Sequence, residues 1–207
     1  MRLRVTYRIT EALRYVGTID MQKVWERLLR RANIPVKYSQ GFHPQPKIQL
    51  ACPLPVGFLS DHEVIDFWVD DEVSFNEIQA RLISTSQPGI EITSVMVADD
   101  KDSALQNLAS ACEYHVTLFG DCDVITLTNQ VSAVLEAENL PRVRRGKAYD
   151  LRPLIHQIEV IANDPVALLM TLSAKPGATG RPEEVLDALG VDPHDARYRR
   201  TRIDFSN

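Results

Sequence analysis

The chain begins with an alternation of polar, mostly cationic, and apolar side chains: Arg2-Leu3-Arg4-Val5-Thr6-Tyr7-Arg8-Ile9. The apolar side chains recur at every second position, which is the period of a strand with one buried face. The opposite face of this strand is almost wholly arginine. A β-strand with a cationic face is therefore the first element that the sequence predicts.

An amphipathic helix is predicted next, because apolar residues return at helical spacing: Met21, Val24, Trp25, Leu28, Leu29 and Ala32. Short strands are predicted near Val36–Ser39 and Ile48–Cys52, with a continuation or further strand at Val64–Val69. The capping box Ser74-Phe75-Asn76-Glu77 opens a second helix, and Ile90–Val97 forms a closing strand. This order of elements is that of a ferredoxin-like unit.

The same order recurs in the second half of the chain. Strands are predicted at residues 114–118, 154–161, 167–173 and 198–205, and helices at residues 127–135 and 182–189. The triplet Asn33-Ile34-Pro35, which ends the first helix, is matched by Asn139-Leu140-Pro141. We therefore predict an α+β protein of two tandem ferredoxin-like domains with antiparallel sheets. They span residues 1–98 and 113–207, joined by a linker at residues 99–112.

Charge is distributed unevenly along the chain, although the net formal charge is only −5. Residues 1–50 carry ten basic and three acidic residues, whereas residues 51–140 carry two basic and sixteen acidic ones. Residues 141–207 are again slightly basic, with eleven against nine. Such segregation indicates a charged partner.

Composition and motifs exclude several classes of function. No apolar run is long enough to span a bilayer or to serve as a signal sequence, so we expect a cytoplasmic protein without a membrane partner. Three cysteines, Cys52, Cys112 and Cys122, lack the spacing of a disulfide framework, a zinc site or an iron–sulfur cluster. Nucleotide-binding and hydrolase motifs are also absent, and we expect no metal and no cofactor.

The segment Ser39-Gln40-Gly41-Phe42-His43-Pro44-Gln45-Pro46-Lys47 is the first functional candidate. Its prolines restrict the backbone and Gly41 permits a tight bend, so the loop is expected to present side chains from a stiff frame. Gln40, Phe42, His43 and Lys47 would suit stacking on a base and contact with phosphate. The alternative is a structural loop in which Phe42 caps the core.

Arginine and lysine gather at three further places that could contact nucleic acid. The segment 140–147 contributes Arg142, Arg144, Arg145 and Lys147, and the last strand contributes Arg200 and Arg202. In a split βαβ sheet, Arg2, Arg4 and Arg8 would lie on the face without helices, and these basic groups could border one groove. The alternative for the 140–147 segment is a solvated basic turn.

A glycine-containing turn at residues 175–182 precedes the last predicted helix and forms a candidate anion site. Lys175, Gly177, Gly180 and Arg181 could combine cations with converging amides at the helix N-terminus. The turn lacks the ending of a phosphate-binding P-loop, and an ordinary connection between strand and helix is the alternative.

Several segments resemble a radical-SAM-associated family of uncharacterised bacterial proteins: residues 15–21, 30–44, 53–57, 150–154 and 181–186, including Ser39-Gln40-Gly41-Phe42-His43-Pro44. The resemblance implies an accessory role beside a radical SAM enzyme and an RNA-related function, without supplying a reaction. It also leads us to expect a histidine where this chain has Thr18. The chain lacks the three-cysteine motif of the radical SAM module itself.

Three functions are consistent with these features. The first is an RNA-binding or substrate-presenting module that works with a radical SAM protein on tRNA or rRNA, without catalysis of its own. The second is a metal-independent endoribonuclease resembling CRISPR-repeat-processing enzymes, with His43 as base and Lys47 or Arg145 stabilising the phosphate. The third is a protein-interaction scaffold. The oligomeric state is left open.

Overall fold

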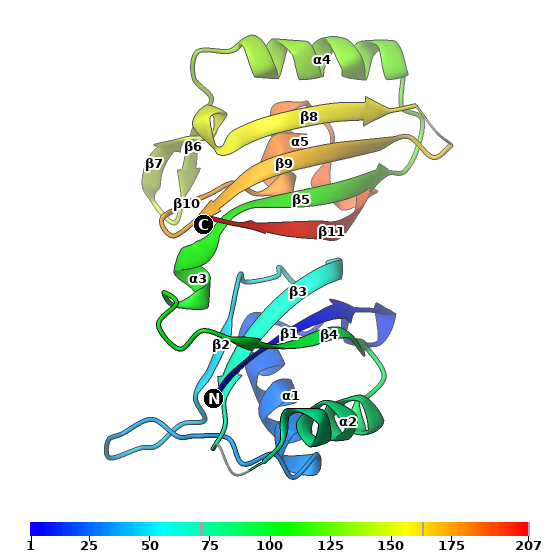
Figure 1. Ribbon diagram of the computed structural model, residues 1–207. Helices are drawn as coiled ribbons and strands as arrows, with labels where there is room; N and C mark the ends of the chain where they lie inside the picture. The colour runs from blue at the N-terminus through cyan, green and yellow to red at the C-terminus, as the bar shows by residue number, and fades with distance from the viewer. Residues whose placement is uncertain (71–72, 163, 207) are drawn as a thin grey trace. The chain divides into compact units, whose positions relative to one another are not determined.

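The computed structural model describes residues 1–70, 73–162 and 164–206, and it shows a mixed α+β protein built on antiparallel sheets (Figure 1). The predicted α+β class is therefore confirmed. The chain divides into two compact units, Met1–Leu108 and Ala109–Asn207.

The first unit follows the predicted order of strands and helices. Its elements are β1 (Arg2–Ile9), α1 (Thr18–Arg31), β2 (Ile48–Leu50), β3 (Leu59–Trp68), α2 (Phe75–Thr85), β4 (Ile90–Ala98) and the short α3 (Leu105–Leu108). The strands lie in the order β2-β3-β1-β4, and every neighbouring pair is antiparallel. Strand β1 thus lies inside the sheet, between β3 and β4.

One face of β1 lies in the core of the first unit, as its alternation predicted. Leu3, Val5, Tyr7 and Ile9 are all at most 3% exposed. They pack with the apolar stripe of α1, where the Trp25 ring meets the Tyr7 ring edge-on at a centroid distance of 4.8 Å. Helix α1 therefore covers the apolar face of the strand, and the arginines of β1 lie on the other face.

Backbone geometry ends α1 at Asn33-Ile34-Pro35, as the sequence predicted. The Ile34 amide donates to the Leu29 carbonyl and the Asn33 amide to the Arg30 carbonyl, each at 3.1 Å, while Asn33 adopts φ 50°. This pair of bonds is a Schellman motif. The Ser74 hydroxyl likewise accepts from the Glu77 amide at 3.3 Å, which caps α2.

Two predicted strands of the first unit differ from the structure. Residues 36–39 form isolated bridges to Val69 and Pro46 in place of a regular strand. Strand β3 begins at Leu59, five residues before the predicted start at Val64.

The second unit has a sheet with the strand order β8-β9-β5-β11 and antiparallel neighbours. Its main elements are β5 (Ala109–Leu118), α4 (Val124–Glu136), β8 (Ile155–Ile161), β9 (Ala167–Lys175), β10 (Ala178–Thr179), α5 (Pro182–Ala188) and β11 (Ala196–Phe205). The short β10 pairs with the end of β9. The basic segment predicted as a loop is a separate hairpin of β6 (Pro141–Arg144) and β7 (Lys147–Asp150).

Candidate nucleic-acid interface

Residues 36–47 form an arm that extends from the first unit (Figure 1). Backbone bonds fix its base, since the Lys37 amide donates to the Trp68 carbonyl and the Lys47 amide to the Lys37 carbonyl, both at 2.7 Å. Farther out, the Ser39 amide donates to the Gln45 carbonyl at 2.8 Å. The Gln45 amide returns a bond to the Ser39 hydroxyl at 3.0 Å. The arm is therefore a closed ribbon from its base to residues 39 and 45.

The tip of the arm, residues 40–44, is exposed to solvent. Phe42 is fully exposed, so it does not cap the core, and the structural alternative for this residue is wrong. Gly41 adopts φ +137°, a conformation that residues with side chains rarely take, which confirms the bend predicted there. The tip thus presents Gln40, Phe42 and His43 together on one tight turn.

A cavity of about 380 Å³ lies between the base of the arm and the last turns of α1. Its volume is within the range of small-ligand pockets, roughly 300–1,000 Å³. Most of its lining is apolar, and three polar side chains stand among the ten lining residues: Glu26, Leu29, Arg30, Asn33, Ile34, Pro35, Val36, Tyr38, Pro46 and Ile48. Leu29 and Ile34 are buried, whereas Tyr38 is 53% exposed. The cavity therefore has an apolar floor and an aromatic side chain accessible at its rim.

Cations lie on the elements that build the arm and the cavity, and Arg30 lines the cavity itself. Arg27 and Arg30 are exposed on the last turns of α1, and Lys37 lies 3.7 Å from Asp70 at the base of the arm. The Lys47 ammonium lies 4.2 Å from the centroid of the Trp68 ring. This contact holds Lys47 in place at the base of the arm while its charge remains accessible.

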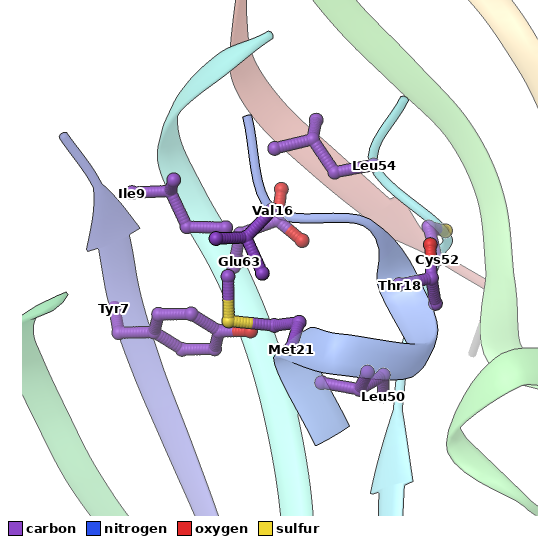
Figure 2. Close-up of a pocket in the computed structure, with 9 residues that line it drawn as sticks. All are labelled: Tyr7, Ile9, Val16, Thr18, Met21, Leu50, Cys52, Leu54 and Glu63. Atoms are coloured by element: carbon purple, nitrogen blue, oxygen red, sulfur yellow. The ribbon is translucent and has the colours of Figure 1, made fainter. Parts of the chain in front are cut away.

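A second cavity, beside β1 and the start of α1, is too small for a substrate (Figure 2). Its volume of about 10 Å³ is near the minimum for one water molecule. Glu63 is only 3% exposed there and points toward Val16, and Thr18 also lines the space. His43 lines neither of these two cavities.

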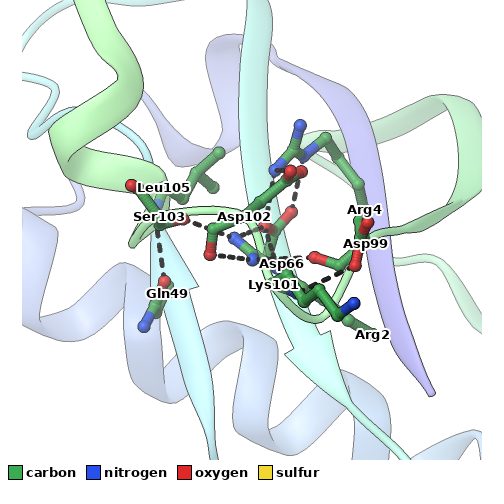
Figure 3. A network of polar contacts seen from close by, with 9 residues as sticks. All are labelled: Arg2, Arg4, Gln49, Asp66, Asp99, Lys101, Asp102, Ser103 and Leu105. Atoms are coloured by element: carbon green, nitrogen blue, oxygen red, sulfur yellow. Dashed lines mark hydrogen bonds and ion pairs between the residues drawn. The ribbon is translucent and has the colours of Figure 1, made fainter.

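Arg2 was predicted on an open, cationic sheet face, but the structure places it in the interior (Figure 3). It is 1% exposed, and its Nε donates to Asp66 at 2.8 Å, with Nη2 at 2.6 Å from the same oxygen. The remaining donors bind the carbonyls of Asp99, Asp102 and Ser103. Its five N–H groups are thus used, and none is left for a phosphate.

The same network corrects the predicted linker, residues 99–112. Arg2 of β1 binds the turn at Asp99–Ser103, and the Leu105 amide donates to the Gln49 side chain of β2 at 3.1 Å, so this segment is bonded to the sheet of the first unit (Figure 3). Strand β5 begins at Ala109, inside the segment predicted as linker. The first unit ends at Leu108 and the second begins at Ala109.

The other two arginines of β1 differ in accessibility. Arg4 is 20% exposed and binds both oxygens of Asp66 at 2.9 Å, and the hydrogen bond to Asp66 raises the pKa of its guanidinium. Arg8 is about half exposed and lies 3.7 Å from Glu91. Only Arg8 of this group remains largely accessible to a ligand.

Two cations of the β6–β7 hairpin are paired with other residues of the protein, and two are exposed to solvent. Arg144 binds Glu184 and Tyr149, and Arg142 lies 3.8 Å from Asp187, so both contact α5. Burial alone would raise the pKa of Glu184, but bonds from Arg144 and Tyr149 outweigh it and lower that pKa. Arg145 and Lys147 are exposed at the turn, where Arg145 adopts φ 50°.

At residues 175–182, the predicted anion site, both glycines have a structural role. A Cβ at Gly180 would lie 3.0 Å from the Leu154 carbonyl oxygen, so this glycine serves close packing. Gly177 allows the turn between β9 and β10 at φ +77°. The first turn of α5 already carries Glu183 and Glu184, which would repel an anion near Lys175 and Arg181.

The two candidate residues on β11 also differ in solvent accessibility. Arg200 is 1% exposed and its Nη2 lies 3.3 Å from the Tyr114 hydroxyl, so it is an interior residue, against the prediction. A register shift after Arg200 places Arg202 beside Glu113, where it is 56% exposed and lies 2.8 Å from Asp204. Arg202 is accessible, with two acidic neighbours.

No group of three potential metal ligands occurs among residues 1–70, 73–162 and 164–206. Within the same residues, no helix is long and apolar enough to cross a membrane. Cys52, Cys112 and Cys122 form no disulfide.

The sequence patterns did not predict the cavity beside the arm. Tyr38, Asn33 and Arg30 line it together, although they belong to three different patterns: a predicted strand, a helix end and a helix face. The available signal was a segment with two aromatic side chains, Tyr38 and Phe42, that is flanked by Pro35 and Pro46.

Comparison with known proteins adds a family and a fold. No curated protein sequence matches the chain. Among solved structures, the chain is similar to a chain of the structure described as "Crystal Structure of a Cbf5-Nop10-Gar1 Complex". The TM-score is 0.51 and the identity is 12%, and the match covers 96% of this chain and 48% of that chain. At this identity the likeness shows the fold alone.

Two further solved structures are more distant. "Structure of H/ACA RNP bound to a substrate RNA containing 2'-deoxyuridine" has a TM-score of 0.44, 14% identity and coverage of 88% of this chain and 43% of that chain. "Crystal structure of the archaeal box H/ACA sRNP Nop10-Cbf5 complex" has a TM-score of 0.44, 14% identity and coverage of 97% and 48%. The present chain spans about half the length of these chains.

The family comparison covers far more of the sequence than any single motif. The model of one bacterial family matches residues 2–182, which includes the arm, the cavity and the β6–β7 hairpin. The chain therefore belongs to the family described as "Uncharacterized protein conserved in bacteria (DUF2344)".

Proposed function

We propose that the chain is a cytoplasmic RNA-binding or substrate-presenting module whose first unit contacts RNA through the arm at residues 36–47. The observation that carries this proposal is the full exposure of Phe42 at the tip of an arm whose base is fixed by backbone bonds. An aromatic ring held in solvent gains free energy when a base stacks on it. Single-stranded RNA offers such bases, because they are not enclosed in a duplex.

The charges near the arm support the same ligand. Arg27, Arg30, Lys37 and Lys47 lie on or beside the elements that build it, against Glu26 and Asp70. Phosphate contacts by such side chains supply most of the affinity that does not depend on sequence. The exposed Arg8, Arg145, Lys147 and Arg202 are retained as weaker candidates.

Replacement of Phe42 tests the proposal directly. Phe42→Ala is expected to weaken binding of a fluorescently labelled single-stranded RNA by about 5- to 150-fold, the effect of losing one stacked base. Fluorescence anisotropy at fixed salt measures the change. Phe119→Ala removes a half-exposed ring from the second unit and serves as the matched control. Equal affinities for the parent and Phe42→Ala would contradict the role of the arm.

The ribonuclease alternative gains no support from the site. His43 is on the open tip and lines neither described cavity, while Lys47, a cation considered for that reaction, lies over Trp68. A general base needs a substrate held within hydrogen-bond reach. We therefore propose a non-catalytic role for His43, as a polar contact at the tip.

A radical SAM protein is retained as the proposed partner. Its support is the family resemblance of the S-Q-G-F-H-P segment and the lack, in this chain, of a three-cysteine motif. Co-purification of the two proteins at low salt, from cells that express both, tests the pairing. Recovery of this chain alone would contradict it.

We also propose that the two units are tandem ferredoxin-like domains. The strand order β2-β3-β1-β4 of the first unit corresponds to β8-β9-β5-β11 of the second when the β6–β7 hairpin is treated as an insertion. In both, two strands joined through a helix are separated by a third, antiparallel strand, which is the split βαβ arrangement.

A further inference from the structure

We propose that the cavity between the arm and α1 receives one unpaired base, so that the module selects single-stranded over double-stranded RNA. This inference rests on the proposed RNA-binding function and specifies the class of RNA. It concerns Tyr38 and the cavity at the base of the arm, a place distinct from Phe42 at the tip.

The lining of the cavity suits a flat, partly polar ring. Leu29 and Ile34 form a buried apolar floor, and Tyr38 leaves half of its surface accessible at the rim. A base has two apolar faces and a polar edge, so it can stack on Tyr38 and cover the floor at once. The volume of about 380 Å³ leaves room for such a ring.

Polar side chains of the same cavity can meet the edge of the ring. Asn33 offers an amide that both donates and accepts, Arg30 offers donors and Glu26 offers acceptors. Asn33 is held by the Schellman motif at the end of α1, and its carbonyl also accepts from Arg81 at 2.8 Å. The backbone of Asn33 is therefore fixed before a ligand binds, which limits the backbone entropy lost on binding.

The charge around the cavity determines the kind of ligand. Among the described residues of α1, the arm and the end of β3, Arg27, Arg30, Lys37 and Lys47 outnumber Glu26 and Asp70, which favours an anionic ligand. An apolar, uncharged peptide would gain nothing from these cations. A nucleotide combines a ring for the cavity with a phosphate for its rim.

A base-paired duplex cannot use this site without losing a pair. The bases of an RNA helix are stacked and enclosed, and a base would have to leave the helix to enter the cavity, at a cost of a few kcal/mol. Single strands present bases without that cost. The cavity thus predicts discrimination by strandedness.

The experiment compares one RNA sequence as a labelled single strand and as a blunt duplex, by fluorescence anisotropy with the full chain. The parent is expected to bind the single strand more tightly. Tyr38→Leu is expected to weaken single-strand binding by about 5- to 150-fold, and Tyr38→Phe, which keeps the ring, to change it less than about twofold. Duplex binding is expected to be the same for all three proteins.

Tyr15→Leu is the matched control, because Tyr15 is an exposed tyrosine of the same unit outside the cavity. Equal parent affinity for single strand and duplex would overturn the inference, as would equal effects of Tyr38→Leu and Tyr15→Leu. If the parent bound neither RNA, the proposed function itself would be wrong. Unfolding of Tyr38→Leu would leave the comparison of the two RNAs by the parent as the deciding result.

Discussion

Asp66 shows how one buried carboxylate organises three separate parts of the first unit. It is fully buried on β3, accepts bonds from Arg2 and Arg4 of β1, and through Arg2 is linked to the turn at Asp99–Ser103. A buried charge is stabilised only when partners compensate its lost hydration. The two arginines supply that compensation, and Arg2 also satisfies three backbone carbonyls.

The first prediction concerns this network. Arg2→Met is expected to reduce the free energy of unfolding by about 3 kcal/mol, because it leaves part of the buried Asp66 charge and three partly buried carbonyls without a partner. Urea denaturation measures the loss. Arg8→Met, at an exposed position of the same strand, is the control and should change stability by less than about 0.5 kcal/mol. Equal effects at both positions would show that the network does not stabilise the fold.

A second prediction uses the two neighbouring glutamates of α5. Burial raises the pKa of Glu183, whose Oε2 is buried and unbonded, whereas Arg144 and Tyr149 lower the pKa of Glu184 despite its burial. A raised pKa in the folded state reduces stability as pH rises above the unfolded value, and a lowered pKa does the reverse. Glu183→Gln should therefore raise the thermal midpoint at neutral pH, and Glu184→Gln should lower it.

The Glu183→Gln difference is expected to disappear as the pH falls to the ordinary glutamate pKa, whereas the Glu184→Gln difference disappears only as the pH falls through the lowered pKa that Glu184 has in the folded state. Thermal unfolding monitored by circular dichroism at several pH values gives the comparison. Shifts of the same sign at neutral pH would contradict the assigned environments of these two residues.

The burial of Arg2 and Arg200 could not be predicted from the sequence. Alternation places both on a strand face correctly, but the partners that admit them to the interior are distant in the chain. Asp66 lies 64 residues from Arg2, and Tyr114 lies 86 residues from Arg200. A strand pattern therefore predicts on which face of the sheet an arginine lies, but it does not predict whether the arginine is accessible to solvent.

At the scale of elements, local signals predicted the helices better than the short strands. The apolar stripe of α1, its end at Asn33-Ile34-Pro35 and the Ser74 capping box are all present in the structure. The β6–β7 hairpin was missed because its residues lack an apolar face, with Val143 72% exposed. Ion pairs with α5 hold it, and these depend on the tertiary fold.

The third prediction concerns the tip of the arm, residues 40–44. Replacing residues 40–44 by Asn-Gly, which favours a tight hairpin turn, is expected to leave the thermal midpoint within about 4 °C of the parent, since the tip makes few contacts with the core. RNA affinity should fall by at least about fivefold, because Phe42 is removed. A large loss of thermal stability would show that the tip packs on the unit, and unchanged affinity would show that it does not contact RNA.

At the scale of the whole molecule, the structure refines the meaning of the charge segregation. The basic excess of residues 1–50 includes Arg2 and Arg4, which are paired with the buried Asp66. The number of cations available to a ligand is therefore smaller than this excess indicates. Most of the accessible cations that remain in this segment lie at the end of α1 and on the arm, whereas Arg8 and Lys23 are exposed elsewhere. The family match to residues 2–182 includes these elements but assigns them no role.

The most direct test of the account is the salt dependence of RNA binding by the full chain. Affinity for a labelled single-stranded RNA is measured by fluorescence anisotropy between about 50 and about 200 mM salt. If about four cations at the arm contact phosphates, the logarithm of the affinity should fall with the logarithm of salt concentration with a slope of about −3. Absence of binding at the lower salt concentration, or an affinity that does not change with salt, would contradict the proposed RNA interface.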